Sequence, residues 1–302
     1  MMDAILKAAE VETPLQRFAR NFFASRIAGA GCIVLLVIVL AAIFAPVIAP
    51  QNPYDLAQID IMDARLAPGA QNADRTFTYL LGTDEQGRDM LSAILYGVRI
   101  SIIVGVVSTV IALAIGLTLG LFAAYFGGRV ENFIMRVADI QLSFPPILVA
   151  LILLALLGPG TSKIVIALVA VQWAYYARTA RSAALVERRK EYMEAAAGLG
   201  LSPLRIVFRH LLPNCLPPLI VIAALQVASA ISLEATLSFL GLGLPVTEPS
   251  LGLLIANGFE YLMSGKYWIS VFPGIVLLLT VVAINLVADQ LRDVLNPRLQ
   301  TL

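Results

Sequence analysis

The sequence is poor in charge and in the side chains that metal sites and nucleophilic sites need. Only 14% of its 302 residues are charged, against about 25% in a typical soluble domain. A formal net charge of +1 argues against a nucleic-acid-binding protein. The single histidine, His210, rules out a histidine-based metal cluster, and the two cysteines, Cys32 and Cys215, cannot build a disulfide framework. The low content of charged residues, histidine and cysteine therefore argues against most soluble and disulfide-rich classes of protein.

Apolar residues make up 59% of the chain, and they gather in six stretches that contain no Asp, Glu, Lys or Arg. A hydrocarbon core of about 30 Å needs about 20 helical residues, and most of the stretches reach that length unaided. The shortest, Ile164–Ala177, is flanked by Lys163 and Arg178, whose long side chains can extend to the interfaces. The composition therefore predicts a protein embedded in a membrane.

The expected fold is an all-α integral membrane bundle of six transmembrane helices. The predicted spans are residues 27–49, 100–126, 138–158, 164–182, 214–238 and 267–289. Pro145-Pro146 should kink the third span. The first stretch is longer than the apolar region of a signal peptide, and 26 residues precede it, so we expect it to stay as an anchor.

Lys and Arg are unevenly distributed between the two sides of this topology. The N-terminal tail and every second connection after it hold 15 of them, and the other side holds 6. Because cytoplasmic segments carry the excess of Lys and Arg, we expect a bacterial inner-membrane protein with cytoplasmic tails at residues 1–26 and 292–302.

The predicted extracytoplasmic loop, residues 50–99, has an excess of three acidic residues. The string Thr83-Asp84-Glu85-Gln86 fits a helix capping box, and Met90, Leu91, Ile94 and Leu95 follow at helical spacing. The pattern favours a short amphipathic helix at the outer surface before the second span. A long solvated loop is the alternative.

The longest cytoplasmic connection runs from Arg178 to about Leu212, and its segment 188–213 is more organised than a passive loop. Gly200 stands where a left-handed residue would end one helix, and Ser202-Pro203 would cap the next. The second helix should end before Pro213 and display one apolar side, made by Leu204, Val207, Phe208 and Leu211. Those side chains would pack either on the protein's own bundle or on a cytoplasmic partner.

The same connection resembles the EAA motif of type I ABC importer permeases. The matching residues are Glu194, Ala195, Ala196, Gly200, Leu212 and Pro213. His210 replaces the isoleucine of the general motif, but the string from Phe208 to Asn214 is similar to the peptide-permease version. In that family the segment is a coupling helix that sits in a groove of the ATPase subunit.

Four further strings extend the resemblance to the C-type subunit of dipeptide and oligopeptide permeases over nearly the whole chain. They are residues 81–92, 96–101, 237–243 and 291–298. The resemblance implies a type I ABC importer permease bundle with an extracytoplasmic loop between helices 1 and 2. It also implies four partners: a second homologous permease, two cytoplasmic ABC ATPases and an extracytoplasmic solute-binding protein.

The chain is not expected to be an enzyme, nor to bind a cofactor or a metal. It contains no phosphate-binding G-x-x-x-x-G-K-[ST] string, since its only Gly-Lys pair, Gly265-Lys266, precedes Tyr267. ATP and Mg would therefore be bound by the partner ATPases. Their closure would move the coupling segment and switch the bundle between inward-open and outward-open states.

Three sets of residues are candidates for functional roles, and the resemblance assigns the first. The coupling set is Glu194, Ala195, Ala196, Gly200, Leu204, Arg205, Phe208, His210, Leu212 and Pro213. The acidic residues Asp84, Glu85 and Asp89 are candidates for contact with the binding protein. Glu194 would brace the ATPase interface or pair within its own helix, and Glu234 would hydrogen-bond within the bundle or line the pathway.

Two other classes of protein compete with the importer hypothesis. A stand-alone secondary transporter or channel would need midplane ionisable groups or an inverted repeat, and the sequence offers only Glu234 and the Pro145-Pro146 break. A membrane-embedded enzyme would need a nucleophile, metal ligands or paired acids, and the sequence offers none of these sets. The sequence does not choose among dipeptide, oligopeptide, nickel chelate, glutathione and other substrates.

Overall fold

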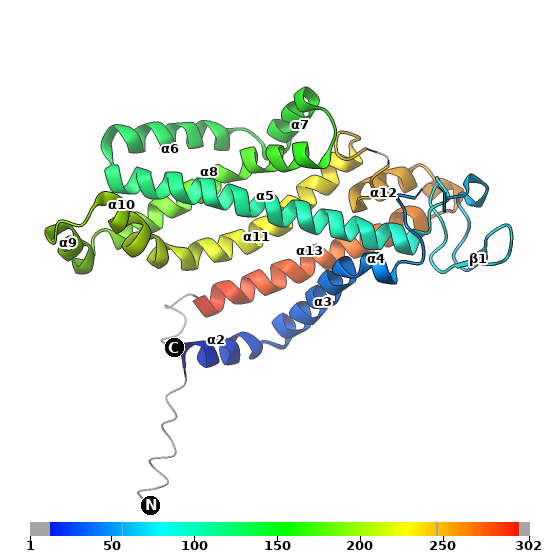
Figure 1. Ribbon diagram of the computed structural model, residues 1–302, viewed down its shortest axis with the longest axis horizontal. Helices are drawn as coiled ribbons and strands as arrows, with labels where there is room; N and C mark the ends of the chain where they lie inside the picture. The colour runs from blue at the N-terminus through cyan, green and yellow to red at the C-terminus, as the bar shows by residue number, and fades with distance from the viewer. Residues whose placement is uncertain (1–12, 56, 246, 296–302) are drawn as a thin grey trace, which may run out of the picture.

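The computed structural model describes residues 13–55, 57–245 and 247–295, and it is an elongated bundle of long helices (Figure 1). The helices are α2 (Pro14–Phe23), α3 (Arg26–Ile43), α4 (Ala45–Ile48), α5 (Met90–Phe126), α6 (Gly128–Ser143), α7 (Pro146–Leu157), α8 (Thr161–Glu187), α9 (Glu191–Gly198), α10 (Pro203–Arg205), α11 (Leu212–Phe239), α12 (Leu251–Phe259) and α13 (Trp268–Leu295). Short turns η1 (Ile61–Asp63), η2 (Ile206–Leu211) and η3 (Leu262–Ser264) and the strands β1 (Ala70–Gln71) and β2 (Thr78–Tyr79) complete it.

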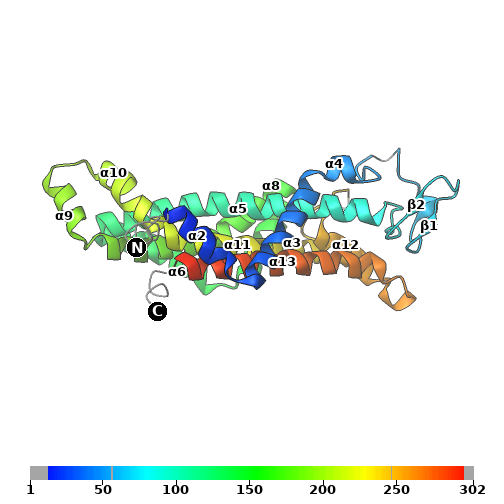
Figure 2. The same ribbon diagram turned by 90° about the horizontal axis from the view of Figure 1, so that it is seen from below.

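The long helices run along the long axis of the molecule, and different short elements lie at its two ends (Figures 1 and 2). We call the end that carries α9 and α10 the α9 end, and the opposite end, with the β1–β2 hairpin, the hairpin end. Helix α2 and the last turn of α13 lie toward the α9 end in both views. Residues 1–12 and 296–302 of the predicted tails lie outside the described residues.

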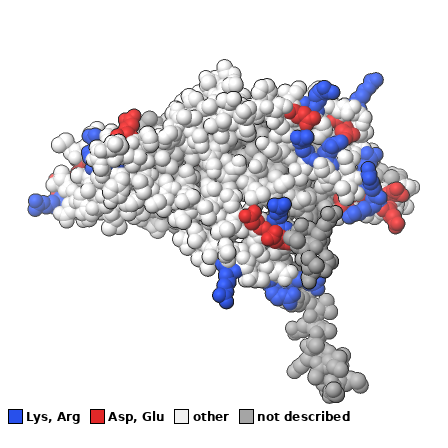
Figure 3. All heavy atoms as spheres, turned by 180° about the vertical axis from the view of Figure 1, so that it is seen from behind, with Lys and Arg blue, Asp and Glu red and all other residues white. Residues whose placement is uncertain are grey.

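Four helices, α3, α5, α13 and the continuous helical stretch Pro203–Phe239, are long and apolar enough to cross a membrane. The bent pair α6–α7 makes a fifth candidate if it counts as one span. Helix α8 has 27 residues, but Lys163, Arg178 and Arg181 interrupt its apolar surface. Six spans therefore remain a prediction. Figure 3 shows an uncharged band between two charged ends, with Lys and Arg more numerous toward the α9 end.

The predicted third span is not one kinked helix. Helix α6 begins at Gly128, about ten residues before the expected start, and α7 leaves it at an angle of 92°. The chain is extended at Phe144 and Pro145. Proline disfavours a helical conformation at the preceding residue and removes a backbone donor, so two consecutive prolines end one helix and start another.

The predicted amphipathic helix in the outer loop is also wrong as a separate element. Met90 begins α5, and the same helix continues to Phe126 without a break. Thr83 is not its cap, because Thr83 pairs with Asp89 in an isolated β-bridge. The cap is Asp89, whose Oδ2 accepts a hydrogen bond from the Ser92 backbone nitrogen at 2.8 Å. The second span therefore extends well into the outer loop.

Helix α5 packs closely along α8. A Cβ atom at Gly116 or Gly120 would overlap with the backbone oxygens of Trp173 and Ala177. The absence of side chains at these two positions, one helical turn apart, lets the two backbones approach each other. The pair α5–α8 is thus the closely packed centre of the bundle, and α11 packs beside it (Figure 1).

The loop between α4 and α5 is folded onto the hairpin end rather than solvated throughout. Asp63 is buried and accepts a hydrogen bond from the Tyr79 hydroxyl at 2.9 Å. The Trp268 indole donates to the Thr83 backbone oxygen at 3.2 Å, which ties the loop to the start of α13. Helix α12, which the sequence analysis did not identify, packs nearby and is capped by Ser250.

Candidate functional site

The segment that matches the EAA motif folds at the α9 end as two helices joined at Gly200. Helix α9 ends at Gly198, and Gly200 has φ +70°, the left-handed conformation expected of it. The Leu201 backbone nitrogen then donates to the Ala196 oxygen at 3.4 Å, as in a Schellman ending. Ser202 and Pro203 start the next helix, although the Ser202 side chain forms no capping hydrogen bond.

The second helix of the segment does not stop before Pro213, as the sequence analysis expected. It passes from α10 through η2, a π-helical stretch, directly into α11. Proline has no backbone N–H to donate to the residue four positions earlier, and a wider π turn immediately before Pro213 accommodates that loss. The segment is therefore continuous with the membrane-spanning helix, and a displacement of one moves the other.

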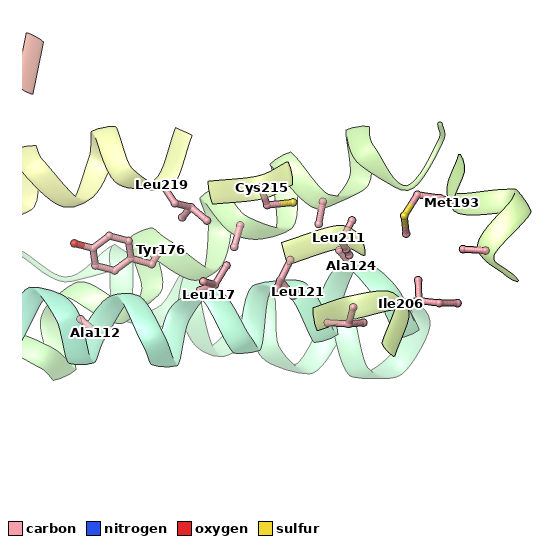
Figure 4. Close-up of a cluster of buried hydrophobic side chains, with 14 residues drawn as sticks. Ala112, Leu117, Leu121, Ala124, Tyr176, Met193, Ile206, Leu211, Cys215 and Leu219 are labelled. Atoms are coloured by element: carbon pink, nitrogen blue, oxygen red, sulfur yellow. The ribbon is translucent and has the colours of Figure 1, made fainter. Parts of the chain in front are cut away.

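The inner side of the segment belongs to the bundle core. Met193, Ile206 and Leu211 are buried, as is Ala196 of the motif. Figure 4 shows Met193 and Leu211 in one hydrophobic cluster with Leu121 and Ala124 of α5, with Leu211 next to Ala124. The sequence analysis did not single out Met193 or Ile206; the three-residue spacing from Met193 to Ala196 was the available signal.

The outer side of the segment is an exposed apolar surface next to charged groups. Leu199 is 80% exposed, Leu204 57% and Phe208 46%. Glu194 and Arg205 are exposed as well. The expected single apolar side therefore has a buried part and an exposed part. Val207 and Leu211 are buried in the bundle and Leu204 is exposed. The ring of Phe208 lies edge-to-face on Phe122 of α5, with centroids 6.2 Å apart, and leaves its other side exposed. We call Leu199, Leu204 and Phe208, with Glu194 and Arg205, the docking surface.

Glu194 makes no ion pair or hydrogen bond with another side chain of the described residues. It does not, therefore, pair with an arginine of its own helix in this conformation. His210 is partly buried, and its backbone oxygen accepts a hydrogen bond from the Asn214 side chain at 2.7 Å. Leu212 is half-buried and Pro213 is exposed.

Polar contacts hold the start of the segment against α5. Arg188 donates to the Ala124 backbone oxygen at 2.8 Å, and its guanidinium lies over the ring of Tyr125. The Tyr192 hydroxyl donates to Glu187 at 2.8 Å. Burial, together with the Glu187 carboxylate, raises the pKa of Tyr192 to about 12, so Tyr192 keeps its proton at neutral pH.

Glu234 lies inside the bundle and is fully buried. Its two carboxylate oxygens accept hydrogen bonds from Ser101 at 2.9 Å and Ser238 at 2.8 Å, and Ser250 also hydrogen-bonds to it. These serines come from α5, from α11 itself and from the cap of α12. In this conformation Glu234 joins three elements and faces no opening, in agreement with the bundle hydrogen-bonding alternative.

Two of the three acidic residues expected to contact a binding protein are not at the surface. Asp84 and Asp89 are each 1% exposed. Asp84 forms an ion pair with the equally buried Arg88 at 2.6 Å, and Asp89 caps α5. Only Glu85 of the three is partly exposed. The local sequence pattern did not reveal this burial, because Asp84 pairs with Arg88 and Asp89 caps α5 inside the folded loop.

The described residues contain no group of three or more His, Cys, Asp or Glu side chains that could hold a metal ion. The described residues form a bundle of apolar helices with the exposed docking surface at its α9 end. Such an arrangement suits a transport subunit that receives movement from outside itself.

Comparisons with known proteins define the class to which this bundle belongs. The chain has the fold of the inward-facing MetNI methionine ABC transporter, with a TM-score of 0.55 and 21% identity over 68% of this chain and 98% of that one. The likeness shows that the chain has the fold of a type I ABC importer permease.

Two family models match consecutive parts of the sequence. Residues 116–301 match the binding-protein-dependent transport system inner membrane component, and residues 13–68 match the N-terminal transmembrane domain of oligopeptide transport permease C. The chain belongs to the binding-protein-dependent transport system inner membrane component family. The resemblance to type I ABC importer permeases is therefore confirmed.

Named relatives align over almost their whole length. The dipeptide transport system permease protein DppC of Escherichia coli K12 is 41% identical over 98% of this chain and 97% of its own. The di/tripeptide permease protein DppC of Pseudomonas aeruginosa UCBPP-PA14 is 40% identical over 95% of this chain and 93% of its own. A permease of this family works with an ATPase and a binding protein.

Proposed function

We propose that this chain is the C-type translocation subunit of an importer for dipeptides, and that it transports a peptide that a binding protein delivers. The observation that carries the proposal is the 41% identity with a dipeptide permease over 98% of the chain. Two ATPases, which bind ATP and Mg, and a second homologous permease would complete the complex. The chain itself would hydrolyse no ATP.

The docking surface is the proposed contact with an ATPase. Leu199, Leu204 and Phe208 place apolar area at the tip of the α9 end, outside the uncharged band of the bundle. Apolar side chains that are exposed outside the membrane mark an interaction site. Glu194 and Arg205 would add charged contacts at its edge, where they give orientation more than affinity.

The proposed topology puts the α9 end in the cytoplasm and the hairpin end outside. The excess of Lys and Arg toward the α9 end supports it, as does the position of α2 and the end of α13 on that same side. Both termini would then be cytoplasmic. The folded loop between α4 and α5 would face the binding protein, and of the three candidate acids only Glu85 would be available for contact.

Reconstitution tests the proposed function directly. The complete complex in vesicles should accumulate a labelled dipeptide only when ATP and the loaded binding protein are both present. Glu194→Lys should abolish uptake and weaken ATPase association, whereas Glu191→Lys, with the same charge change in the same helix, should have a smaller effect. Uptake that persists without ATP would instead indicate a secondary transporter.

A further inference from the structure

Helix α6 has two exposed sides that differ in their chemistry. Phe133, Val137 and Ile140 are exposed, and they follow one another at helical spacing. Asp139 and Ser143, which are exposed as well, lie on the adjoining side of the helix. An exposed apolar side suits lipid, whereas an exposed carboxylate does not. Helix α6 therefore lies at a boundary between lipid and polar surroundings.

An ion pair continues the polar side of α6 onto α8. Arg178 Nη2 and Asp139 Oδ1 are 3.5 Å apart, and each side chain is 57% exposed. Tyr175 and Ser182, one turn to either side of Arg178, are exposed too. The Ser182 hydroxyl donates to the Arg178 backbone oxygen at 2.9 Å. We call Asp139, Ser143, Tyr175, Arg178 and Ser182 the polar face.

The polar face lies at a depth where α5 is uncharged. A Cβ atom at Gly120 of α5 would overlap with the backbone oxygen of Ala177, which precedes Arg178. Gly120 lies eight residues before Gly128, where the uncharged stretch of the second span ends, so Arg178 is about 12 Å inside that stretch. Asp139 follows Gly128 by eleven residues on α6, which runs back along α5 (Figure 1), and reaches a similar depth of about 16 Å. Charged side chains inside a membrane bundle mark polar pathways.

A second ion pair, which is less exposed, already ties α6 to α8. Arg181 Nε donates to Glu131 Oε1 at 2.7 Å, and these side chains are 34% and 21% exposed. The pair of Asp139 and Arg178 is longer and more exposed, and exposed ion pairs contribute little to stability. Its two charges can therefore separate at small cost and meet a ligand of both signs.

We propose that Asp139 and Arg178 bind the charged ends of the peptide as it crosses the membrane, with the peptide carboxylate on Arg178 and the peptide ammonium on Asp139. The inference rests on the proposed function and adds the residues that recognise the substrate class. A guanidinium matches a carboxylate in shape. A dipeptide spans at most about 7 Å between its ends, a distance that two exposed side chains on neighbouring helices can bridge.

Such a site recognises the peptide main chain and not its side chains. The two protein charges cancel, as do the two charges of the peptide, so that one ion pair is exchanged for two. The exposure of Asp139 and Arg178 keeps the site weak, and a pathway needs a site that releases what it binds.

The complete complex in vesicles tests the site by the number of dipeptides taken up per ATP hydrolysed. Arg178→Gln should lower this ratio about tenfold, the loss expected for one hydrogen bond between charged groups, while ATP hydrolysis stimulated by the loaded binding protein persists. Asp139→Asn should act in the same direction. Arg181→Gln breaks the less exposed pair on the same two helices and should leave the ratio unchanged, even where it lowers both rates.

A failure of this inference differs from a failure of the proposed function. An unchanged ratio in Arg178→Gln, or an equal fall in Arg181→Gln, would overturn the contact with the peptide while dipeptide uptake by the unaltered complex still stands. An unaltered complex that takes up no dipeptide would refute the proposed function, and this inference with it.

Accessibility to a chemical reagent tests the polar face without removing either charge. In a chain with Cys32→Ala and Cys215→Ala, Ser182→Cys should react with a charged, water-soluble maleimide in the complete complex. Loaded binding protein with ATP should slow that reaction, and Ile140→Cys, on the apolar side of α6, should not react. If Ser182→Cys reacts in the isolated chain but not in the complex, the second permease covers the polar face, and the proposal is overturned.

Discussion

Asp89 connects the folded outer loop to the start of α5. Its carboxylate accepts hydrogen bonds from the backbone nitrogen and the hydroxyl of Ser92, while its own backbone nitrogen donates to the Gln51 side chain at 2.6 Å. Gln51 in turn donates its backbone N–H to Ser92 at 3.0 Å. These contacts fix the loop to the helix that continues through the bundle.

We expect Asp89→Ala to loosen the loop by about 1 kcal/mol, the usual cost of losing a helix cap. Asp89→Asn should keep the cap, because asparagine caps a helix as well as aspartate does. Hydrogen exchange of residues 51–93 measures the effect. Asp74→Ala, at an exposed position of the same loop, serves as the control, and equal protection in all three variants would contradict the assignment.

The same residue gives a pH dependence with a definite sign. Burial raises the pKa of the Asp89 carboxyl above its usual value, against the opposing effect of the Ser92 hydrogen bonds. The folded loop then holds the proton more tightly than the unfolded chain, so loop stability falls as the pH rises from about 3.9 through the raised pKa. Asp89→Asn should remove this component, and an identical pH profile in the variant would refute it.

Gly200 has positive φ but open space around it. Backbone strain, rather than a clash, therefore decides which residues the position accepts. Gly200→Val should strain the turn, turn α10 away from its direction and abolish ATPase binding. Gly200→Asn should retain most binding, because asparagine tolerates the left-handed region. The two affinities for the ATPase are compared directly, and equal affinities would show that the turn does not set the docking geometry.

The individual residues differed in how far the sequence predicted them. Gly200 was predictable because its conformation depends on the local chain alone. Asp84 and Asp89 were not, because their burial depends on Arg88 and on Gln51, which lies 38 residues before Asp89. Local patterns cannot reveal which side of a folded loop an acid will face.

Helix α5 links the two ends of the molecule. Its 37 residues span about 55 Å, against about 30 Å for a hydrocarbon core. Met90 and Ile94 pack with Trp268 at the hairpin end, and Leu121 and Ala124 pack with residues 193–211 at the α9 end. In the proposed mechanism, a helix of this length would carry movement between the loop and the docking surface.

Weakening the middle of α5 should therefore uncouple the two ends. Val110→Gly with Ile111→Gly, both at exposed positions, costs about 1 kcal/mol per site in helix stability relative to alanine. We expect the loaded binding protein to stimulate ATP hydrolysis several-fold less, with basal hydrolysis unchanged. Val110→Ala with Ile111→Ala removes the same side-chain contacts, and equal stimulation in the two variants would show that stiffness is not required.

The elements also show where sequence patterns fail. Long uncharged stretches correctly indicated the helices α3, α5, α11 and α13, because a run of about 20 apolar residues favours one long helix. The 92° turn between α6 and α7 depends on packing around Pro145, and the passage through η2 depends on how the bundle accommodates Pro213. Helix α12 is too short to give a clear period.

The features with proposed functions lie in different parts of the molecule. The hairpin end holds the folded loop, the uncharged band holds the bundle, and the α9 end holds the docking surface and most Lys and Arg (Figures 1 and 3). The central claim is that movement enters this chain through residues 188–213 from an ATPase that the chain does not itself contain. The motif and the composition predicted this division, because it follows from charge and apolar content.

Purification of the tagged chain from its native membrane in mild detergent, with an assay of ATP hydrolysis, tests that claim most directly. The account predicts recovery of a second permease and ATPase subunits, with ATP hydrolysis that is lost, together with the ATPases, when Leu204 and Phe208 are both replaced by Glu. Recovery of a stable chain alone, with no ATPase and with transport intact in that variant, would contradict it.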